Sequence, residues 1–394
     1  MPEERSSPRK ADWQAWLVRP RGHRFALAPQ PPDLPGLWDL TRATDVVPHW
    51  TAIFRANARF LLEIVAAEGD RDALPRAERA VEIFEGLLRD LDAGAAARSV
   101  RTVHAVTLVR EHLLRGHDLP DAFRGIKARE AGRVLLEAPA ALERAWELGG
   151  WDDSREALVE VLSDLLAGNL FDLGSRWTQE AFRAGDLDIA GARRAYRERV
   201  SQCLSGWDPA VLERLQPRPR PLDAPAEGRV LLFADNAGAD FLLGILPAAV
   251  FWARRWEVVV VVNSLPASSD IAIQEARAHW SLLGALPGGP LARVQAAGRL
   301  SLIESGTGSP GIDLRFVGAA LNGATPNVHW ILLEGQGRAI ETNWATSFVC
   351  PVLRAAVVKD PCVAEKIHVR AGEPQLRWDE AHGAAPGDLD KETR

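Results

Sequence analysis

The spacing of hydrophobic and polar positions along the chain changes once, near residue 216. From about residue 50 to residue 215 apolar side chains recur at helical spacing. Two such stripes are formed by Ile53, Ala56, Phe60, Leu61 and Ile64, and by Val81, Phe84, Leu88 and Leu91. Beyond residue 228 short apolar runs alternate with helical stretches. The pattern therefore predicts an all-helical first half and an α/β second half.

The second half contains four apolar runs of strand length. These runs are Val230–Phe233, Glu257–Val262, Leu300–Glu304 and His329–Leu333. Helical stretches follow the first and second runs, at Phe241–Arg254 and Ile271–Leu283. Alternation of strands and helices predicts a Rossmann-like parallel sheet with helices on both faces.

Composition along the chain predicts five segments. Residues 1–48 are rich in Pro, Arg and Trp and are expected to form an irregular arm with only short helices, and 49–215 should form the helical domain. Residues 216–228 hold four prolines and should act as a connector. We expect the α/β domain at 229–371 and a polar tail at 372–394.

Polar side chains follow each of the four predicted strands. Asp235 and Asn236 follow the first, Asn263 and Asp270 the second, Ser305 to Thr307 the third, and Glu334 to Asn343 the fourth. Any one of them is explained equally well by a turn or a helix cap, as for Asp270 before its helix. Because parallel strands present their carboxyl ends at one edge, four polar ends together favour one site there.

The residue types at this edge suit a hard cation and an anion. Asp235, Asn236 and Asp270 offer oxygen ligands of the kind that bind Mg²⁺ or Mn²⁺ at roughly 2.0–2.2 Å. Zinc is disfavoured without a His or Cys cluster, and a dinucleotide without a Gly-rich turn. Arg338 and Lys359 are candidate phosphate binders, although a solvated cation explains either one alone. The backbone of the Ser305-Gly-Thr-Gly turn could also bind an anion.

Composition narrows the class of protein. The 394 residues are 47% hydrophobic and 25% charged, as in ordinary globular proteins. A net charge of −6 without a long basic run argues against a nucleic-acid partner. The three scattered cysteines indicate neither a disulfide framework nor a thiolate metal site. The longest aliphatic run is too short to span a bilayer, so we expect a cytoplasmic protein without a membrane partner. The oligomeric state stays open.

Six sequence blocks, in order, resemble a known family. The blocks are Asp121–Glu130, Ala167–Gly174, Leu232–Asp240, Asn263–Asp270, Glu334–Asn343 and Cys350–Lys359. They are similar to the signature blocks of the DUF89 proteins, metal-dependent damage-control phosphatases with an ARMT1-like fold. The resemblance covers roughly residues 50–370. The branch that it resembles most is the one related to the phosphatase domain of pantothenate kinase 4.

The resemblance implies a function and a set of site residues. It implies hydrolysis of phosphate monoesters on small metabolites, including damaged or surplus ones. The metal, Mg²⁺ or Mn²⁺ with Co²⁺ or Ni²⁺ as alternatives, would be held by Asp235, Asn236 and Asp270. Asp235, or a water that it positions, would attack the phosphoryl group or handle the proton. The phosphate-binding candidates are Asn169, reaching over from the helical half, with Ser305, Arg338, Asn343 and Lys359.

The chain departs from the family pattern near the expected pocket. Ser269 stands where the family commonly has Asn, Gln336 where it has Met, and Glu341 where it has His. The three metal ligands are intact, so we predict an active phosphatase. A first alternative is a non-catalytic metal- or metabolite-binding protein of the same fold. A methyltransferase is a second alternative, disfavoured by the missing Gly-rich fingerprint.

Overall fold

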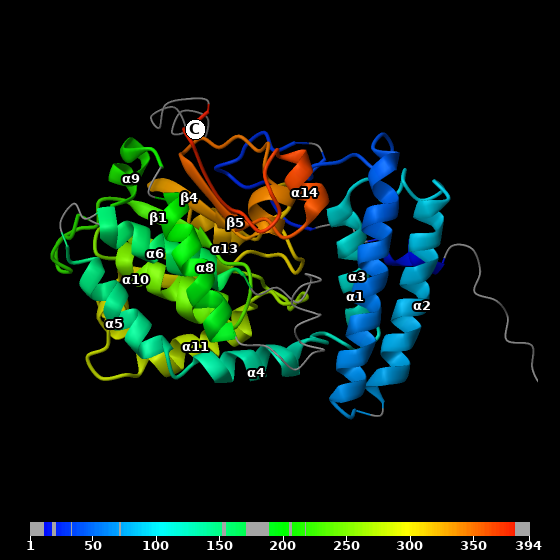
Figure 1. The fold of residues 1–394 in the computed structure, drawn as a ribbon, viewed down its shortest axis with the longest axis horizontal. Coiled ribbons are helices and arrows are strands. Elements are labelled where there is room, and N and C mark those ends of the chain that lie inside the picture. Colours follow the sequence, from blue (N-terminus) through cyan, green and yellow to red (C-terminus); the bar gives the residue numbers. More distant parts are fainter. Residues whose placement is uncertain are drawn as a thin grey trace, which may run out of the picture. The chain divides into compact units, whose positions relative to one another are not determined.

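The chain forms two compact units in a computed structural model (Figure 1). One unit comprises Met1–Pro20 and Leu34–Ile126, and the other comprises Arg21–Asp33 and Lys127–Arg394. The structure describes residues 12–17, 21–32, 34–70, 72–151, 155–170, 189–204, 207–216 and 218–382.

The first unit is helical, as its periodicity predicts. Its long helices pack through their apolar stripes, and the rings of Phe54 and Phe84 meet edge to face at 5.8 Å. Thr102 caps the third long helix by accepting a hydrogen bond from the N–H of Ala105 at 3.1 Å. The elements are η1 (Asp12–Trp16), η2 (Thr44–Val46), α1 (Val47–Ala67), α2 (Ala73–Asp92) and α3 (Val103–Gly116).

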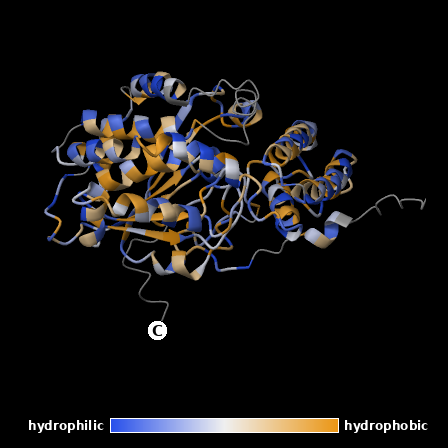
Figure 2. Cartoon of the chain, turned by 90° about the horizontal axis from the view of Figure 1, so that it is seen from below, coloured by the Kyte–Doolittle hydropathy of each residue, from blue (hydrophilic) through white to orange (hydrophobic). Residues whose placement is uncertain are grey.

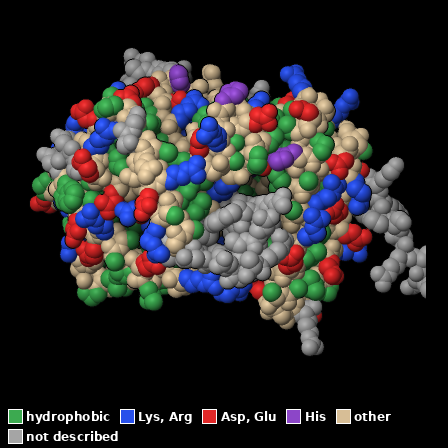
Figure 3. All heavy atoms as spheres, in the orientation of Figure 1, with side chains coloured by type: hydrophobic (Ala, Val, Ile, Leu, Met, Phe, Trp, Pro, Cys, Tyr) green, Lys and Arg blue, Asp and Glu red, His purple; other side chains and the backbone are tan. Residues whose placement is uncertain are grey.

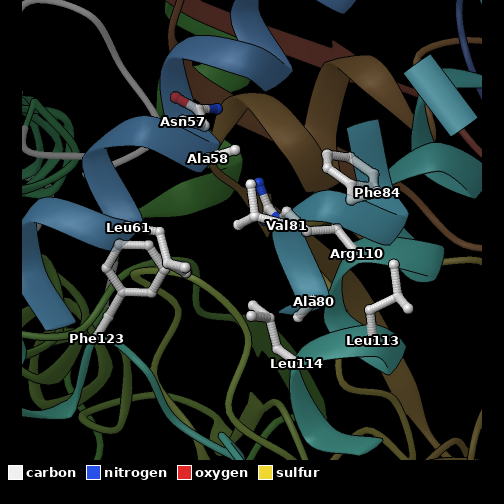
Figure 4. A pocket seen from close by; sticks show the side chains of 10 residues that line it. All are labelled: Asn57, Ala58, Leu61, Ala80, Val81, Phe84, Arg110, Leu113, Leu114 and Phe123. Carbon is white, nitrogen blue, oxygen red and sulfur yellow. The ribbon is translucent and has the colours of Figure 1, made fainter. Parts of the chain in front are cut away.

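This helical unit contains an apolar pocket between α1, α2 and α3 (Figure 4). Leu61, Phe84, Leu114 and Phe123 are among the side chains that line it. Its one charged lining residue, Arg110, already donates to Glu111 Oε1 at 2.6 Å. The pocket therefore lacks the free cation that a phosphate group would require.

The second unit is built on a six-stranded sheet in the order β3-β2-β1-β4-β5-β6. β1 to β5 run parallel, and β6 pairs antiparallel with β5. The four predicted strands are confirmed to within one residue at each end, and β5 and β6 are additional. The strands are β1 (Arg229–Phe233), β2 (Glu257–Val262), β3 (Leu300–Glu304), β4 (Val328–Glu334), β5 (Val352–Val357) and β6 (Pro374–Asp379).

The strand order makes β1 the switch point of the sheet. β2 and β3 lie on one side of β1, and β4 and β5 on the other. Phe233, the last residue of β1, pairs with both Val261 and Leu333. In open α/β sheets a crevice forms where the strand order reverses in this way. The residues directly after β1 are therefore placed at the centre of the carboxyl edge.

Helices surround the sheet, and the strands and the inner helix faces carry most of the apolar residues (Figure 2). The predicted helix 241–254 is divided into a π-helical turn, η3 (Asp240–Ile245), and α10 (Leu246–Trp252). Pro247 has no N–H to continue the hydrogen-bond ladder, which accounts for the change of helix type. The other helices are α4 (Arg124–Val134), α5 (Ala138–Leu148), α6 (Arg155–Gly168), α8 (Ile189–Leu204), α9 (Pro209–Leu215), α11 (Ile273–Gly284), α12 (Pro290–Ala296), α13 (Ala319–Gly323) and α14 (Pro361–Lys366), with the π-helical turn η4 (Gln336–Glu341) after β4.

The compact units divide the chain at residue 126 rather than at the connector 216–228. Helices α5 and α6 pack against η3 and α10, so their apolar faces belong to the core of the sheet unit. Residues 21–32 also join this unit, through a backbone bridge from His23 to Val317. β6 lies within the segment expected to be a polar tail, because its residues complete the sheet edge beside β5.

Charged side chains of both signs lie on the surface. On the face drawn in Figure 3, acidic and basic side chains are interspersed rather than gathered by sign. Among the described helices, none combines the length and the apolar character that crossing a membrane requires.

The packing of the segment 21–32 can be tested at Phe25. Its side chain is fully buried and meets the ring of Phe233 edge to face at 6.0 Å. Phe25→Ala should therefore lower the free energy of unfolding of the sheet unit by about 3–5 kcal/mol. Urea unfolding followed by tryptophan fluorescence measures this. Leu265→Ala is the control, because this side chain is 49% exposed. It should change the free energy of unfolding by about 0.5 kcal/mol or less. Equal effects of the two substitutions would contradict the packing.

Candidate active site

Asp235 and Asn236 occupy the turn that leaves β1, and both are buried. The backbone N–H of Asp235 donates to Glu334 Oε2 at 2.8 Å. The next N–H, of Asn236, donates to Asp240 Oδ2 at 2.9 Å. Each N–H of the pair is thus held by a buried carboxylate from a different element.

Asp270 lies beside this pair, although 34 positions separate it from Asn236 in the sequence. The two residues form an isolated antiparallel bridge, and the N–H of Ile271 donates to the carbonyl of Asp235 at 3.0 Å. Ser268 adopts a positive φ of 49° in the turn that brings Asp270 back to the sheet edge. The structure therefore brings Asp235, Asn236 and Asp270 together at the carboxyl edge.

Arg338 links two of these residues from η4. Its guanidinium is 2% exposed and is paired with Asp235 Oδ1 and, at 2.7 Å, with Asp270 Oδ2. It also donates to Asn263 Oδ1 at 3.1 Å. Burial alone would lower the pKa of Arg338, but the charges of Asp270 and Asp235 outweigh burial and raise that pKa. The predicted phosphate binder is therefore a fixed cation between two predicted metal ligands.

Gly335 allows β4 to approach Asp235. Its φ of +93° lies where side chains are strained, and a Cβ there would come within 2.2 Å of the Asp235 carboxyl group. A glycine at this position is thus required both by the backbone conformation and by the space that the carboxylate fills.

Two further carboxylates, of Asp240 and Glu334, lie behind Asp235 and are fully buried. One oxygen from each of Asp235, Asp240 and Glu334 lies within 4.8 Å of the other two. Among the described residues, Asp240 Oδ1 and Glu334 Oε1 have no hydrogen-bond partner. Burial, and then the charge of Asp235, raises the pKa of Asp240 to about 7. Burial and the charges of Asp240 and Asp235 also raise the pKa of Glu334.

Sequence reasoning did not select Asp240 or Glu334 as site residues. Two features of the sequence could have indicated them. Glu334 is the last residue of a strand, and Asp240 follows Asn236 at a spacing of four. Only the fold shows that both side chains turn back to the strand end of β1.

Asn169, directly after α6, reaches the carboxylates as expected. Its Nδ2 donates to Asp235 Oδ2 at 3.2 Å and to Asp240 Oδ2 at 3.1 Å. Its Oδ1 accepts the N–H of Val357 at 3.3 Å. The amide therefore ties α6 and β5 to the carboxylates, and its N–H groups are directed at them.

Ser305 makes contacts within its own turn, and Asn343 bonds to the backbone of two different segments. Ser305 Oγ lies 2.8 Å from the hydroxyl of Thr307, next to Gly306 in the left-handed region. Asn343 Nδ2 donates to the carbonyl of Arg338 at 2.9 Å and of Ile312 at 3.0 Å. Asn343 thus supports the backbone that carries the guanidinium rather than joining the carboxylates.

Lys359 follows β5, and its charge lowers the pKa of Asp240 and of Glu334. Its N–H donates to Gln336 Oε1 at 2.7 Å, as does the N–H of Asp360 at 3.2 Å. The other end of this carboxamide, Gln336 Nε2, donates to Glu341 Oε1 at 2.6 Å. Two positions at which the chain departs from the family pattern are therefore in direct contact, and Gln336 connects η4 to the end of β5.

Comparison with known proteins identifies the family. A family model described as the damage-control phosphatase ARMT1-like domain matches residues 51–374. The chain belongs to this family. The resemblance expected from the six blocks is thus confirmed, and the matched region includes all of the site residues described above.

Curated relatives of this ARMT1-like chain carry related names. Pantothenate kinase 2 of Arabidopsis thaliana is 32% identical over 81% of this chain, and the chain spans 37% of that relative's length. Damage-control phosphatase At2g17340 of the same plant is 29% identical, with 78% of this chain and 81% of the relative covered. The 4'-phosphopantetheine phosphatase of Mus musculus is 26% identical, with 85% and 46% covered. A crystal structure of a DUF89 family protein from Pyrococcus horikoshii aligns with a TM-score of 0.48 and 18% identity, over 82% of this chain and 96% of that one.

Two glycines test the close contact at Asp235. Gly335→Ala should destabilise the protein by the strain of its backbone, about 1–3 kcal/mol, and by a further cost of about 1–3 kcal/mol for displacing the Asp235 carboxyl group. Gly298→Ala is the matched control, because Gly298 also has a positive φ, of 67°, but a Cβ there meets nothing within 4 Å. Urea unfolding of both variants measures the difference, and equal losses would contradict the contact.

Glu130 of α4 provides a test by pH. Its carboxylate accepts the N–H of Ala239 at 3.2 Å. Burial, followed by the charges of Asp240 and Glu275, raises the pKa of Glu130 from 4.5 to about 7. Since the folded protein disfavours the ionised form, the contribution of Glu130 to stability should fall as pH rises from about 4.5 to about 7. The unfolding midpoint of Glu130→Gln should therefore decline less between pH 5 and pH 8 than that of the wild type. Parallel declines would show that Glu130 titrates normally.

Proposed function

We propose that this ARMT1-like chain is a metal-dependent phosphomonoesterase that acts on small phosphorylated metabolites. One observation carries the proposal, namely the excess of buried negative charge at the carboxyl edge of the sheet. The family match and the names of two relatives, a damage-control phosphatase and a 4'-phosphopantetheine phosphatase, support the reaction class.

Four carboxylates at this edge are buried, those of Asp235, Asp240, Asp270 and Glu334. Within the described part of the chain, Arg338 is the one buried guanidinium that is paired with any of them. Buried charges are stable only when they are compensated. A divalent cation would supply the missing positive charge.

The chemistry of the donors favours Mg²⁺ or Mn²⁺, because all are carboxylate or amide oxygens. We assign the metal to Asp235, Asn236 and Asp270, which follow the neighbouring strands β1 and β2 at the carboxyl edge of the sheet. Bound there, the metal would polarise the phosphoryl group and neutralise the charge that develops during transfer.

The residues of the chain would orient the reaction. Arg338 donates to the carboxylates of both Asp235 and Asp270, which fixes the orientation of these two side chains. Asp235 would either attack the phosphorus or orient the water that does. Lys359 follows the end of β5, where its charge acts on the carboxylates of Asp240 and Glu334, and its ammonium group would neutralise a phosphate oxygen.

The proposal can be tested with a substrate panel. We expect turnover of p-nitrophenyl phosphate, sugar phosphates or phosphopantetheine that requires Mg²⁺, Mn²⁺, Co²⁺ or Ni²⁺ and is lost with EDTA. Asp235→Ala should reduce kcat/KM by about 10²–10⁴-fold, because it removes a metal ligand and the group that handles the proton. Asp223→Ala is the matched control, since Asp223 is exposed and lies before β1. The activity of this variant should equal that of the wild type.

Two outcomes would contradict a phosphatase. One is the absence of metal-dependent turnover on every member of the panel, and the other is an Asp235→Ala variant as active as the wild type. Binding of Mn²⁺ in calorimetry without turnover would instead indicate a non-catalytic metal-binding protein.

A further inference from the structure

Asp240 is fully buried at the start of η3, four residues after Asn236. Its Oδ2 accepts three N–H groups: the backbone N–H of Asn236 at 2.9 Å, Asn236 Nδ2 at 3.2 Å and Asn169 Nδ2 at 3.1 Å. This carboxylate oxygen therefore holds both the backbone and the side chain of one proposed metal ligand.

The contacts determine which way the Asn236 carboxamide points. Its Nδ2 donates to the carboxylates of Asp240 and, at 2.9 Å, Asp235. Its Oδ1 faces the other way and accepts the hydroxyl of Ser269 at 2.7 Å. A flipped carboxamide would place its oxygen against two carboxylate oxygens, which offer no donor when they are ionised. The carboxylates thus select the orientation in which Oδ1 faces the side of Asp270.

Close packing holds Asp240 in this position. A Cβ on Gly168 of α6 would lie 3.1 Å from Asp240 Cα and 3.4 Å from Asp240 Oδ1. Gly244 of η3 comes similarly close to α6, where a Cβ would lie 3.3 Å from the carbonyl oxygen of Leu165. With glycines on both elements, α6 and η3 meet backbone to backbone, and the carboxylate has little freedom to move.

We propose that Asp240 is a positioning residue that presents Asn236 Oδ1 to the metal. The inference rests on the proposed metal-dependent function and deepens it. Groups that hydrogen-bond to a metal ligand fix its orientation, and their loss typically reduces metal affinity by about 10–100-fold. Asp240 acts here through the N–H groups of Asn236, and not through a bond of its own to the metal.

Calorimetric titration with Mn²⁺ separates these roles. Asp240→Ala should weaken Mn²⁺ binding by about 10–100-fold. Asp240→Asn should restore most of the affinity, because its Oδ1 can still accept the N–H groups of Asn236. Asp223→Ala is the control: it removes an exposed carboxyl group that lies before β1, and Mn²⁺ affinity should stay within about twofold of the wild type.

A double-variant cycle tests whether Asp240 acts through Asn236. In an Asn236→Ala background, Asp240→Ala should cause little further loss of Mn²⁺ affinity, because no carboxamide remains to be oriented. Should Asp240→Ala fail to fold, Asp240→Ser replaces it, since a serine side chain is too short to reach Asn236 Nδ2.

Four results would overturn the inference. Asp240→Ala with Mn²⁺ affinity within twofold of the wild type would show that the contact does not matter. Asp240→Asn as weak as Asp240→Ala, or losses that add in the double variant, would point to direct ligation or a general structural role. A wild-type protein with neither Mn²⁺ binding nor turnover would overturn the proposed function together with this inference. The other three results, which concern the Asp240 variants, would leave the proposed function standing.

Discussion

The buried ion pairs of Arg338 with Asp235 and Asp270 are the interaction on which the rest of the site depends. They connect the turns that follow β1, β2 and β4, three segments that are distant in sequence. Removal of one member of such a buried set leaves an uncompensated charge, which typically costs about 3–5 kcal/mol. The surrounding contacts of glycine, amide and carboxylate groups keep the side chains of Arg338, Asp235 and Asp270 in fixed relative positions. The geometry of the proposed active site and its local stability therefore depend on the same ion pairs.

The sequence was sufficient to predict where the polar strand ends would meet, because central strands have a simple signature. β1, β2 and β4 are short runs of Val, Leu, Ile and Phe, buried on both faces, and they were predicted nearly residue by residue. Polar residues after such strands have to meet at one edge, so the convergence of Asp235, Asn236 and Asp270 followed from the sheet alone. β6 was missed because it is a half-buried edge strand without a continuous apolar run.

The partners of each side chain could not be predicted in the same way. From the sequence, Arg338 was predicted to bind phosphate, because the residues next to it in the chain do not indicate that two carboxylates contact it. Asp240 and Glu334 read as ordinary polar residues, since their burial depends on α6 and on the neighbouring strands. The departures at Gln336 and Glu341 look independent along the chain, whereas the structure shows one hydrogen-bonded pair. Contacts of this kind depend on tertiary packing, which the spacing of residue types does not encode.

The segment 21–32 has a consequence for how the chain folds. The N–H of Phe25 donates to the carbonyl of Leu314 at 2.8 Å, so nearly three hundred residues must be made before this contact can form. The helices of residues 34–126 lie between the two parts of the sheet unit in sequence and depend mainly on local contacts. Local contacts form quickly, and the entropy of closing a long loop delays distant ones. During synthesis the helices of residues 34–126 can therefore form first, whereas this contact of Phe25 forms only after Leu314 has left the ribosome.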